Sequence, residues 1–281
     1  MRQGVYDCLL ALTIVFSVLN PVLAKEPLVL ISGNLYQHRD VDPQEKHLLA
    51  LFSQALSGEF AVETLWLNQQ MRMSMIRRFD NYCSYNAIRT AEREQHSYFS
   101  RYPSTIYPSR KLVSLKGRFD GLPERVSVSA LLEQKFTMAI VGMSYYGELT
   151  PLLSARPEQI VQLSGSETYD QLISMFERDR FDMLIEYEDF VRRIVGQRDV
   201  LQFRQIAEYD NSPVAGFFFC SISESGRRAV DIIDDFFRSK AMLEGLRDFH
   251  TSRFSPGDQA LIFRQFRELY GLDLQKGQTQ H

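Results

Sequence analysis

The residues that follow segment 82–88 have the types and spacing of an anion-binding site. Thr90, Glu92 and Arg93 belong to the string TAER, directly after a segment whose composition (YCSYNAI) predicts a strand. The guanidinium of Arg93 is always charged and presents a planar fork of donors to a carboxylate. The alternative is a solvated arginine paired with Glu92 or Glu94, and the sequence leaves both open.

A second polar segment, GMSYYG at 142–147, follows a predicted strand at 136–141 and precedes a predicted helix. Ser144 and the backbone N–H groups around it could hold an anion at the helix N-terminus. Tyr145 or Tyr146 could stack on a ligand. A turn whose tyrosines pack on the surface explains the same residues, and the sequence does not choose between them.

Signatures of catalysis and of metal binding are missing from the sequence. It contains no Walker A motif, no G-x-G-x-x-G, no C-x-x-C and no G-x-S-x-G. His38 with Asp40 and Asp42 could hold a metal, but a solvated loop is the simpler interpretation. We therefore expect no metal, no cofactor and a binding role rather than an enzyme, although a fold can also assemble a catalytic pair from distant residues.

The segments that must position these residues alternate between strand-like and helix-like patterns. This alternation predicts an α/β fold with mainly parallel sheets flanked by helices. The 281 residues suffice for one large domain or two small ones, and a net charge of −3 argues against a nucleic-acid partner. Predicted strands lie at 28–32, 60–67, 82–88, 111–115, 136–141, 159–163, 182–185, 201–206 and 215–220, and predicted helices begin at 42, 69, 168, 223 or 225, and 255.

The N-terminus predicts export. Arg2 precedes an apolar run at 8–19, which Asn20 and Pro21 end, and small residues follow up to Ala24. This pattern is typical of a secretory signal peptide cleaved after Ala24, which places the protein in the periplasm. An uncleaved anchor or a buried first helix is the alternative, although the run is short for a membrane span.

Export changes the interpretation of the cysteines, because only Cys83 and Cys220 remain after cleavage. Both lie in predicted strands. In an oxidising compartment they predict one long-range disulfide. Two separate buried thiols that pack as small apolar groups are the alternative, and the sequence leaves both open.

The string after segment 82–88 resembles the periplasmic solute-binding proteins of polar amino-acid transport (solute-binding family 3). In that family the same strand leads into T-x-E-R and then F-S-x-P; here Pro103 stands one residue late. Segment 165–185 is similar to the family's helix–strand unit in its second lobe, and the element order agrees over nearly the whole chain after residue 24. The matching residues are Thr90, Glu92, Arg93, Phe99 and Ser100.

The resemblance implies a two-lobed type II periplasmic-binding-protein fold with two crossover segments. Lobe one would combine residues 25–112 with 213–281, and lobe two would hold residues 113–212. A small, carboxylate-bearing ligand would lie in the cleft between the lobes, with Arg93 and Thr90 beside it, and hinge closure would capture it.

Three positions depart from the family's pattern. Ile88 stands where the family has a hydroxyl ligand, and Tyr187 stands where it has an aspartate for the ligand's ammonium group. The loop after the first strand differs as well, although its Tyr36 is still expected to face the cleft. The fold is therefore expected to persist more than the amino-acid specificity. Acidic residues that could replace the aspartate surround Tyr187: Glu186, Glu188 and Asp189.

The leading expectation is an exported, monomeric solute-binding protein that serves a membrane permease. The alternative is a ligand-sensing or adaptor module for a membrane signalling receptor. A periplasmic dehydratase-like enzyme is a third interpretation, since this fold includes such enzymes. It would need a cleft carboxylic acid with a raised pKa, for which Glu186 or Glu188 could be tried.

We predict that the mature chain begins at Lys25, because the apolar run ends in small residues at 22–24. Intact mass spectrometry of protein recovered from the periplasm checks this. A mass that still includes residues 1–24 would contradict it.

Overall fold

The computed structural model describes most of the chain. The predicted signal peptide up to residue 23 and the candidate contacts Tyr36, Ser144 and Tyr145 lie outside the described residues. Within the described part, no helix is both long and apolar enough to cross a membrane. The described residues are 24–33, 43–67, 69–76, 78–141, 146–164, 168–195, 199–210 and 212–275.

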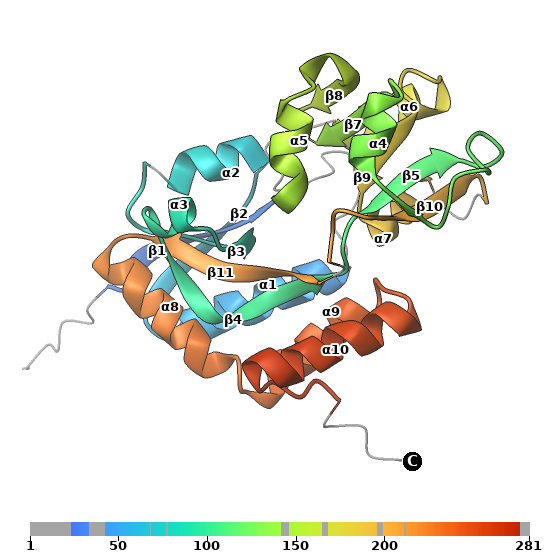
Figure 1. Ribbon diagram of the computed structural model, residues 1–281. Helices are drawn as coiled ribbons and strands as arrows, with labels where there is room; N and C mark the ends of the chain where they lie inside the picture. The colour runs from blue at the N-terminus through green and yellow to red at the C-terminus, as the bar shows by residue number, and fades with distance from the viewer. Residues whose placement is uncertain are drawn as a thin grey trace, which may run out of the picture.

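Lobe one is built on a five-stranded sheet with the strand order β2-β1-β3-β11-β4 (Figure 1). Its strands are β1 (Glu26–Gly33), β2 (Phe60–Leu67), β3 (Tyr82–Ile88), β4 (Ser97–Tyr107) and β11 (Val214–Ser221). Its helices are α1 (Pro43–Leu56), α2 (Gln69–Ile76), α3 (Ala91–Glu94), α8 (Glu224–Phe236), α9 (Lys240–Thr251) and α10 (Pro256–Tyr270).

Alternation along the strands gives lobe one a core on each face of its sheet. Leu28 and Leu30 of β1 face a large core with α1, α8, α9 and α10. Ile31, one residue further, faces a smaller core with α2. Figure 1 shows these two groups of helices on opposite sides of the sheet.

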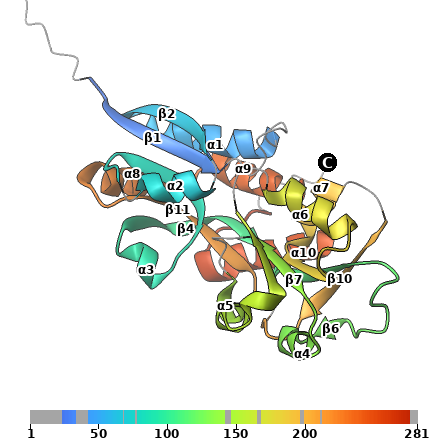
Figure 2. The same ribbon diagram turned by 90° about the horizontal axis from the view of Figure 1, so that it is seen from above.

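Lobe two is built on a six-stranded sheet with the strand order β6-β10-β5-β9-β7-β8. Seen from above, β7, β10, α4 and α5 occupy one end of the molecule, and β1, α1, α2 and α8 occupy the other (Figure 2). Its strands are β5 (Lys111–Leu115), β6 (Arg125–Val126), β7 (Met138–Val141), β8 (Ile160–Leu163), β9 (Met183–Glu186) and β10 (Leu201–Ile206). Its helices are α4 (Val128–Glu133), α5 (Thr150–Ser154), α6 (Thr168–Glu177) and α7 (Glu188–Val195).

The chain crosses between the sheets twice, from Tyr107 to Lys111 and from Ile206 to Val214. All of β5 lies in the second sheet, so the first crossing comes a few residues before the expected boundary at 112. The strands that follow the crossings, β5 and β11, run antiparallel to both their neighbours. The other described strand pairs are parallel, so the sheets are mixed where the chain enters them.

Two of the elements that the sequence analysis did not predict are substantial. Strand β4 carries Pro103 and many polar residues (SYFSRYPSTIY), which obscure a strand pattern. Proline is tolerated there because β4 is the edge strand, and its register with β11 shifts at Phe217. Helix α9 is the other; its N-cap is Ser239, whose side chain accepts a hydrogen bond from the Met242 N–H.

A buried histidine, His250, links the carboxyl end of β4 to α9 by a hydrogen bond. Nε2 of His250 accepts the backbone N–H of Ile106 at 3.0 Å, so Nδ1 carries the proton and donates to the Leu246 carbonyl at 2.6 Å. Burial lowers the pKa of His250 to about 4, and the ring is neutral at physiological pH. This bond holds the strand that leads into the first crossing.

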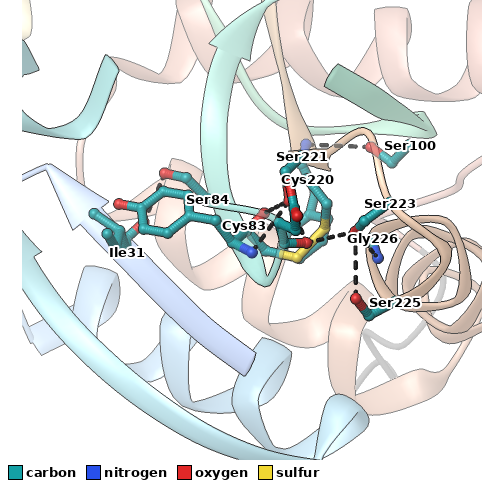
Figure 3. The surroundings of a disulfide bond; sticks show 12 residues. Ile31, Cys83, Ser84, Ser100, Cys220, Ser221, Ser223, Ser225 and Gly226 are labelled. Carbon is teal, nitrogen blue, oxygen red and sulfur yellow. Dashed lines mark hydrogen bonds between the residues drawn. A yellow bond between two sulfur atoms is a disulfide. The ribbon is translucent and has the colours of Figure 1, made fainter. Parts of the chain in front are cut away.

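Cys83 and Cys220 form a disulfide, which selects one of the two alternatives that the sequence left open. The two residues are directly opposed in β3 and β11, and both are fully buried. Figure 3 shows serines around the bond; Ser84 donates to the Ile31 carbonyl at 2.6 Å and so ties β3 to β1. The cysteines are 137 residues apart, so the bond closes a loop that contains all of lobe two.

We expect the double variant Cys83→Ala/Cys220→Ala to lose about 2–4 kcal/mol of unfolding free energy, because the bond restricts the unfolded chain. Denaturant unfolding measures the loss, and non-reducing peptide mapping identifies the linked peptides. Reductant should lower the stability of the wild type and leave the double variant unchanged. Two free thiols in exported protein would contradict the prediction.

Candidate functional site between the lobes

The TAER string forms a short helix at the carboxyl end of β3. Thr90 is the N-cap of α3, and its side-chain oxygen accepts the backbone N–H of Arg93 at 3.3 Å. Arg93 is half-buried, and its Nη1 donates to the Ile88 carbonyl at 2.8 Å. The neighbouring Arg89 is more exposed and pairs with Glu94. Thr90 thus has a structural role, and Arg93 lies against the end of β3.

A second arginine that the sequence analysis missed binds the same strand. Arg72 of α2 is 7% exposed, and its Nη1 donates to the Tyr85 carbonyl at 3.2 Å. Burial lowers the pKa of Arg72, and the nearby charge of Arg93 lowers it further. Two arginines are therefore bound to carbonyls of the second half of β3, Arg72 at Tyr85 and Arg93 at Ile88. Helical periodicity gave no signal for Arg72, because a lone arginine in a methionine-rich helix is normally solvated.

A β-bulge in β3 creates the position that Arg72 uses. The register between β3 and β11 passes over Tyr85 and Asn86, and Asn86 has a positive φ of 61°. Gly216 of β11 faces the bulge, where a Cβ atom would collide with the Asn86 side chain. Position 216 therefore has to be glycine. The bulge leaves Tyr85 outside the register with β11, and the Tyr85 carbonyl accepts a hydrogen bond from Arg72.

Arg110, from the first crossing segment, is the central cation between the lobes. Its guanidinium lies 4.6 Å from the ring centroid of Tyr146 and 4.3 Å from that of Tyr187. Its Nε lies 3.4 Å from Oε1 of Glu186, which also accepts the Tyr187 N–H at 2.8 Å. Burial by itself would lower the pKa of Arg110. The contacts with Tyr187, Glu186 and Tyr146 outweigh this effect, so the pKa of Arg110 is raised.

Both rings of this box are neutral phenols. Burial raises the pKa of Tyr187 and of Tyr146 above the ordinary value, although Arg110 partly offsets this. The Tyr146 hydroxyl accepts the Val141 N–H at 2.7 Å. Tyr146 is therefore buried at the end of β7, unlike the surface tyrosine of the alternative interpretation of segment 142–147.

Ion pairs and an aromatic contact continue from this box into lobe one. The rings of Tyr107 and Tyr187 lie 5.1 Å apart, across the first crossing. Nη2 of Arg253, after α9, lies 3.1 Å from Glu45 of α1. Glu45 also accepts hydrogen bonds from the Tyr85 hydroxyl and, at 3.3 Å, from Ser32.

Asp189 of α7 adds a carboxylate from lobe two to this group of residues. It lies 3.0 Å from Arg193, and burial raises the pKa of Asp189 to about 6 although Arg193 and Arg253 both oppose the shift. We call the following residues the interlobe cluster: Glu45, Tyr107, Arg110, Tyr146, Glu186, Tyr187, Asp189, Arg193 and Arg253.

The structure thus brings together part of the predicted site. Glu186 and Tyr187 belong to the interlobe cluster, whereas Thr90 and Arg93 lie at the end of β3. Tyr85 links the two groups, since its carbonyl binds Arg72 and its hydroxyl binds Glu45. Among the described residues, no group of acidic, histidine or cysteine side chains is arranged to hold a metal ion.

We expect wild-type stability, measured relative to Asp189→Asn, to fall as the pH rises from about 4 to about 7. The Asp189 carboxyl titrates at about 6 when folded and near 3.8 when unfolded, so in this window the folded state holds a proton that the unfolded chain has lost. The change should be on the order of 2 kcal/mol.

Denaturant unfolding of both proteins across this pH range measures the difference. Buried His250 shifts stability in the opposite direction, but it is present in both proteins and its contribution cancels. Parallel stability curves for wild type and variant would contradict a raised pKa at Asp189.

Comparison with known proteins identifies the architecture of the fold. No family model matches the sequence, and no curated protein matches it significantly. A putative L-cystine ABC transporter protein of Listeria monocytogenes superposes with a TM-score of 0.61 at 9% identity, over 83% of this chain and 98% of that chain. A Salmonella typhimurium periplasmic binding protein with high arginine specificity gives 0.60 at 12% identity, over 82% and 100%.

A third solved structure has the same architecture. The VFT2 domain of Bordetella pertussis BvgS superposes with a TM-score of 0.58 at 14% identity, over 81% of this chain and 93% of that chain. At these identities the likeness establishes the architecture. The chain has the two-lobed α/β fold of the amino-acid-type periplasmic solute-binding proteins.

Proposed function

We propose that this protein is an exported solute-binding protein that captures a small, carboxylate-bearing ligand between its lobes. The observation that carries the proposal is the half-buried guanidinium of Arg93, which lies at the carboxyl end of β3 and donates to the Ile88 carbonyl. Ligands of open α/β sheets bind outside the carboxyl ends of the strands. Arg72, held on the Tyr85 carbonyl of the same strand, adds a second positive charge that favours an anion.

The two crossing segments are suited to act as the hinge. They touch each other through the Ser109 hydroxyl, which donates to the Ser212 carbonyl at 3.0 Å. We propose that these segments join lobe one, residues 25–110 with 213–281, to lobe two, residues 111–212. Closure would bring lobe two, with the GMSYYG segment, onto a ligand held at β3.

The remaining parts of the proposal follow from export and fold. The signal peptide would be removed after Ala24, and the mature protein would work in the periplasm as a monomer. Its protein partner would be a membrane permease, and its task would be binding without catalysis. Glu186, a residue considered for acid catalysis, lies in an ion pair with Arg110 and is 1% exposed.

A sensing role is the second candidate, favoured by the departure at Tyr187, which stands where the family has an aspartate for the ligand's ammonium group. In that case a membrane signalling protein, instead of a permease, would detect the closed form of the protein. Genes beside this one discriminate between the two, since a permease gene would favour uptake and a receptor gene would favour sensing.

We expect Arg93→Ala to weaken binding of a carboxylate ligand by about 2–5 kcal/mol, because it removes a charge-assisted contact from a desolvated site. Arg93→Lys should recover only part of the loss, since lysine lacks the planar fork. A thermal-shift screen of carboxylic and amino acids identifies the ligand, and calorimetry measures the affinities.

Arg89→Ala is the matched control for this test. Arg89 lies four residues before Arg93 and is itself paired with Glu94 at the surface, so its loss should leave the affinity unchanged. Equal affinity for wild type and folded Arg93→Ala would show that Arg93 is not the anchor.

A further inference from the structure

We infer that the interlobe site selects carboxylic acids that carry no ammonium group, and therefore rejects zwitterionic α-amino acids. The inference rests on the proposed function, because it takes Arg93 as the anchor of the ligand's carboxylate. It deepens that function by naming the ligand class from the charges that already occupy the region between the lobes.

The carboxylates of the interlobe cluster are already bound by the protein's own cations. Glu186 is held by Arg110, and Asp189 is held by Arg193. Glu45 is held by Arg253 and also accepts the Tyr85 hydroxyl. An ammonium group needs such a carboxylate to replace its hydration, and each one here has a resident guanidinium.

The aromatic faces that could hold a cation are occupied in the same way. Arg110 lies against both Tyr146 and Tyr187, and Tyr107 contacts Tyr187 as well. A ligand ammonium that approached this box would meet the positive charge of Arg110 in a region of low dielectric, where like charges repel strongly. The internal arginine therefore takes the place that a ligand cation would need.

Displacing Arg110 would be costly. Arg110 is 8% exposed and Glu186 is 1% exposed, so removing one partner would leave the other as a buried, unpaired charge. A ligand cation would have to move Arg110 into water and then replace its ion pair and both ring contacts. The anion side differs, because the positive charge of Arg93, the proposed anchor, attracts a ligand carboxylate directly.

Matched acids and amino acids test the inference on the exported protein. The pairs are succinate with aspartate, glutarate with glutamate, 4-methylpentanoate with leucine, and 3-phenylpropanoate with phenylalanine. We expect at least one acid to raise the melting temperature and to bind at least about tenfold more tightly than its amino-acid partner, which corresponds to one unfavourable charge contact. Amino acids that bind as tightly as the acids, or more tightly, would overturn the inference.

Arg110→Gln tests the cause. It removes the internal cation and leaves the Glu186 carboxylate available, so the preference for the acid should shrink by about tenfold or reverse. The double variant Arg110→Gln/Glu186→Gln is the matched control, because it removes both charges and should not gain affinity for amino acids. An unchanged preference in folded Arg110→Gln would overturn the role given to Arg110. If that variant does not fold, the wild-type series still decides the inference.

Arg93→Ala separates failure of the inference from failure of the proposed function. Amino-acid binding that is lost in Arg93→Ala would overturn the inference and support the proposed function. If no member of either series binds in an Arg93-dependent way, the proposed function fails, and the inference fails with it.

Discussion

The buried guanidinium of Arg110 is the constraint on which the arrangement of the two lobes depends. A charge in this position is stable only if a carboxylate and aromatic faces surround it. Glu186 and Tyr187 at the end of β9 and Tyr146 at the end of β7 supply these groups. Because Arg110 belongs to the first crossing segment, satisfying its charge fixes where that segment meets the sheet of lobe two.

Two interactions within lobe one hold the strands that lead into and out of lobe two. The Cys83–Cys220 disulfide joins β3, which leads to Arg93, to β11, which returns from lobe two. His250 fastens the end of β4 to α9, just before Tyr107 and the first crossing. The chain ends that enter and leave lobe two are thus both anchored in one core. Relative motion of the lobes would then be concentrated in the short crossing segments.

The arginines on β3, Arg72 and Arg93, differ in electrostatic character from the interlobe cluster. Along the second half of β3, Arg72 is held on the Tyr85 carbonyl and Arg93 on the Ile88 carbonyl. In the interlobe cluster, cations and carboxylates are matched and largely buried. Under the proposed function, an anionic ligand would be attracted to these two arginines and would meet neutral ion pairs in the interlobe cluster. The β3 bulge causes this asymmetry, since it presents the Tyr85 carbonyl to Arg72.

The sequence by itself determined the elements with regular local patterns, such as β1, α1, β3 and α10, and the resemblance that implied two lobes. It also placed Arg93, Glu186 and Tyr187 at strand ends, because a strand end is visible in local composition. Only the tertiary structure decided that Arg72, Arg110 and Arg253 belong beside them. Each of these residues looks like a solvated charge in its own segment, and its partner comes from a distant part of the chain. Whether such a charged residue is buried depends on how the lobes pack, and the local sequence around it does not show this.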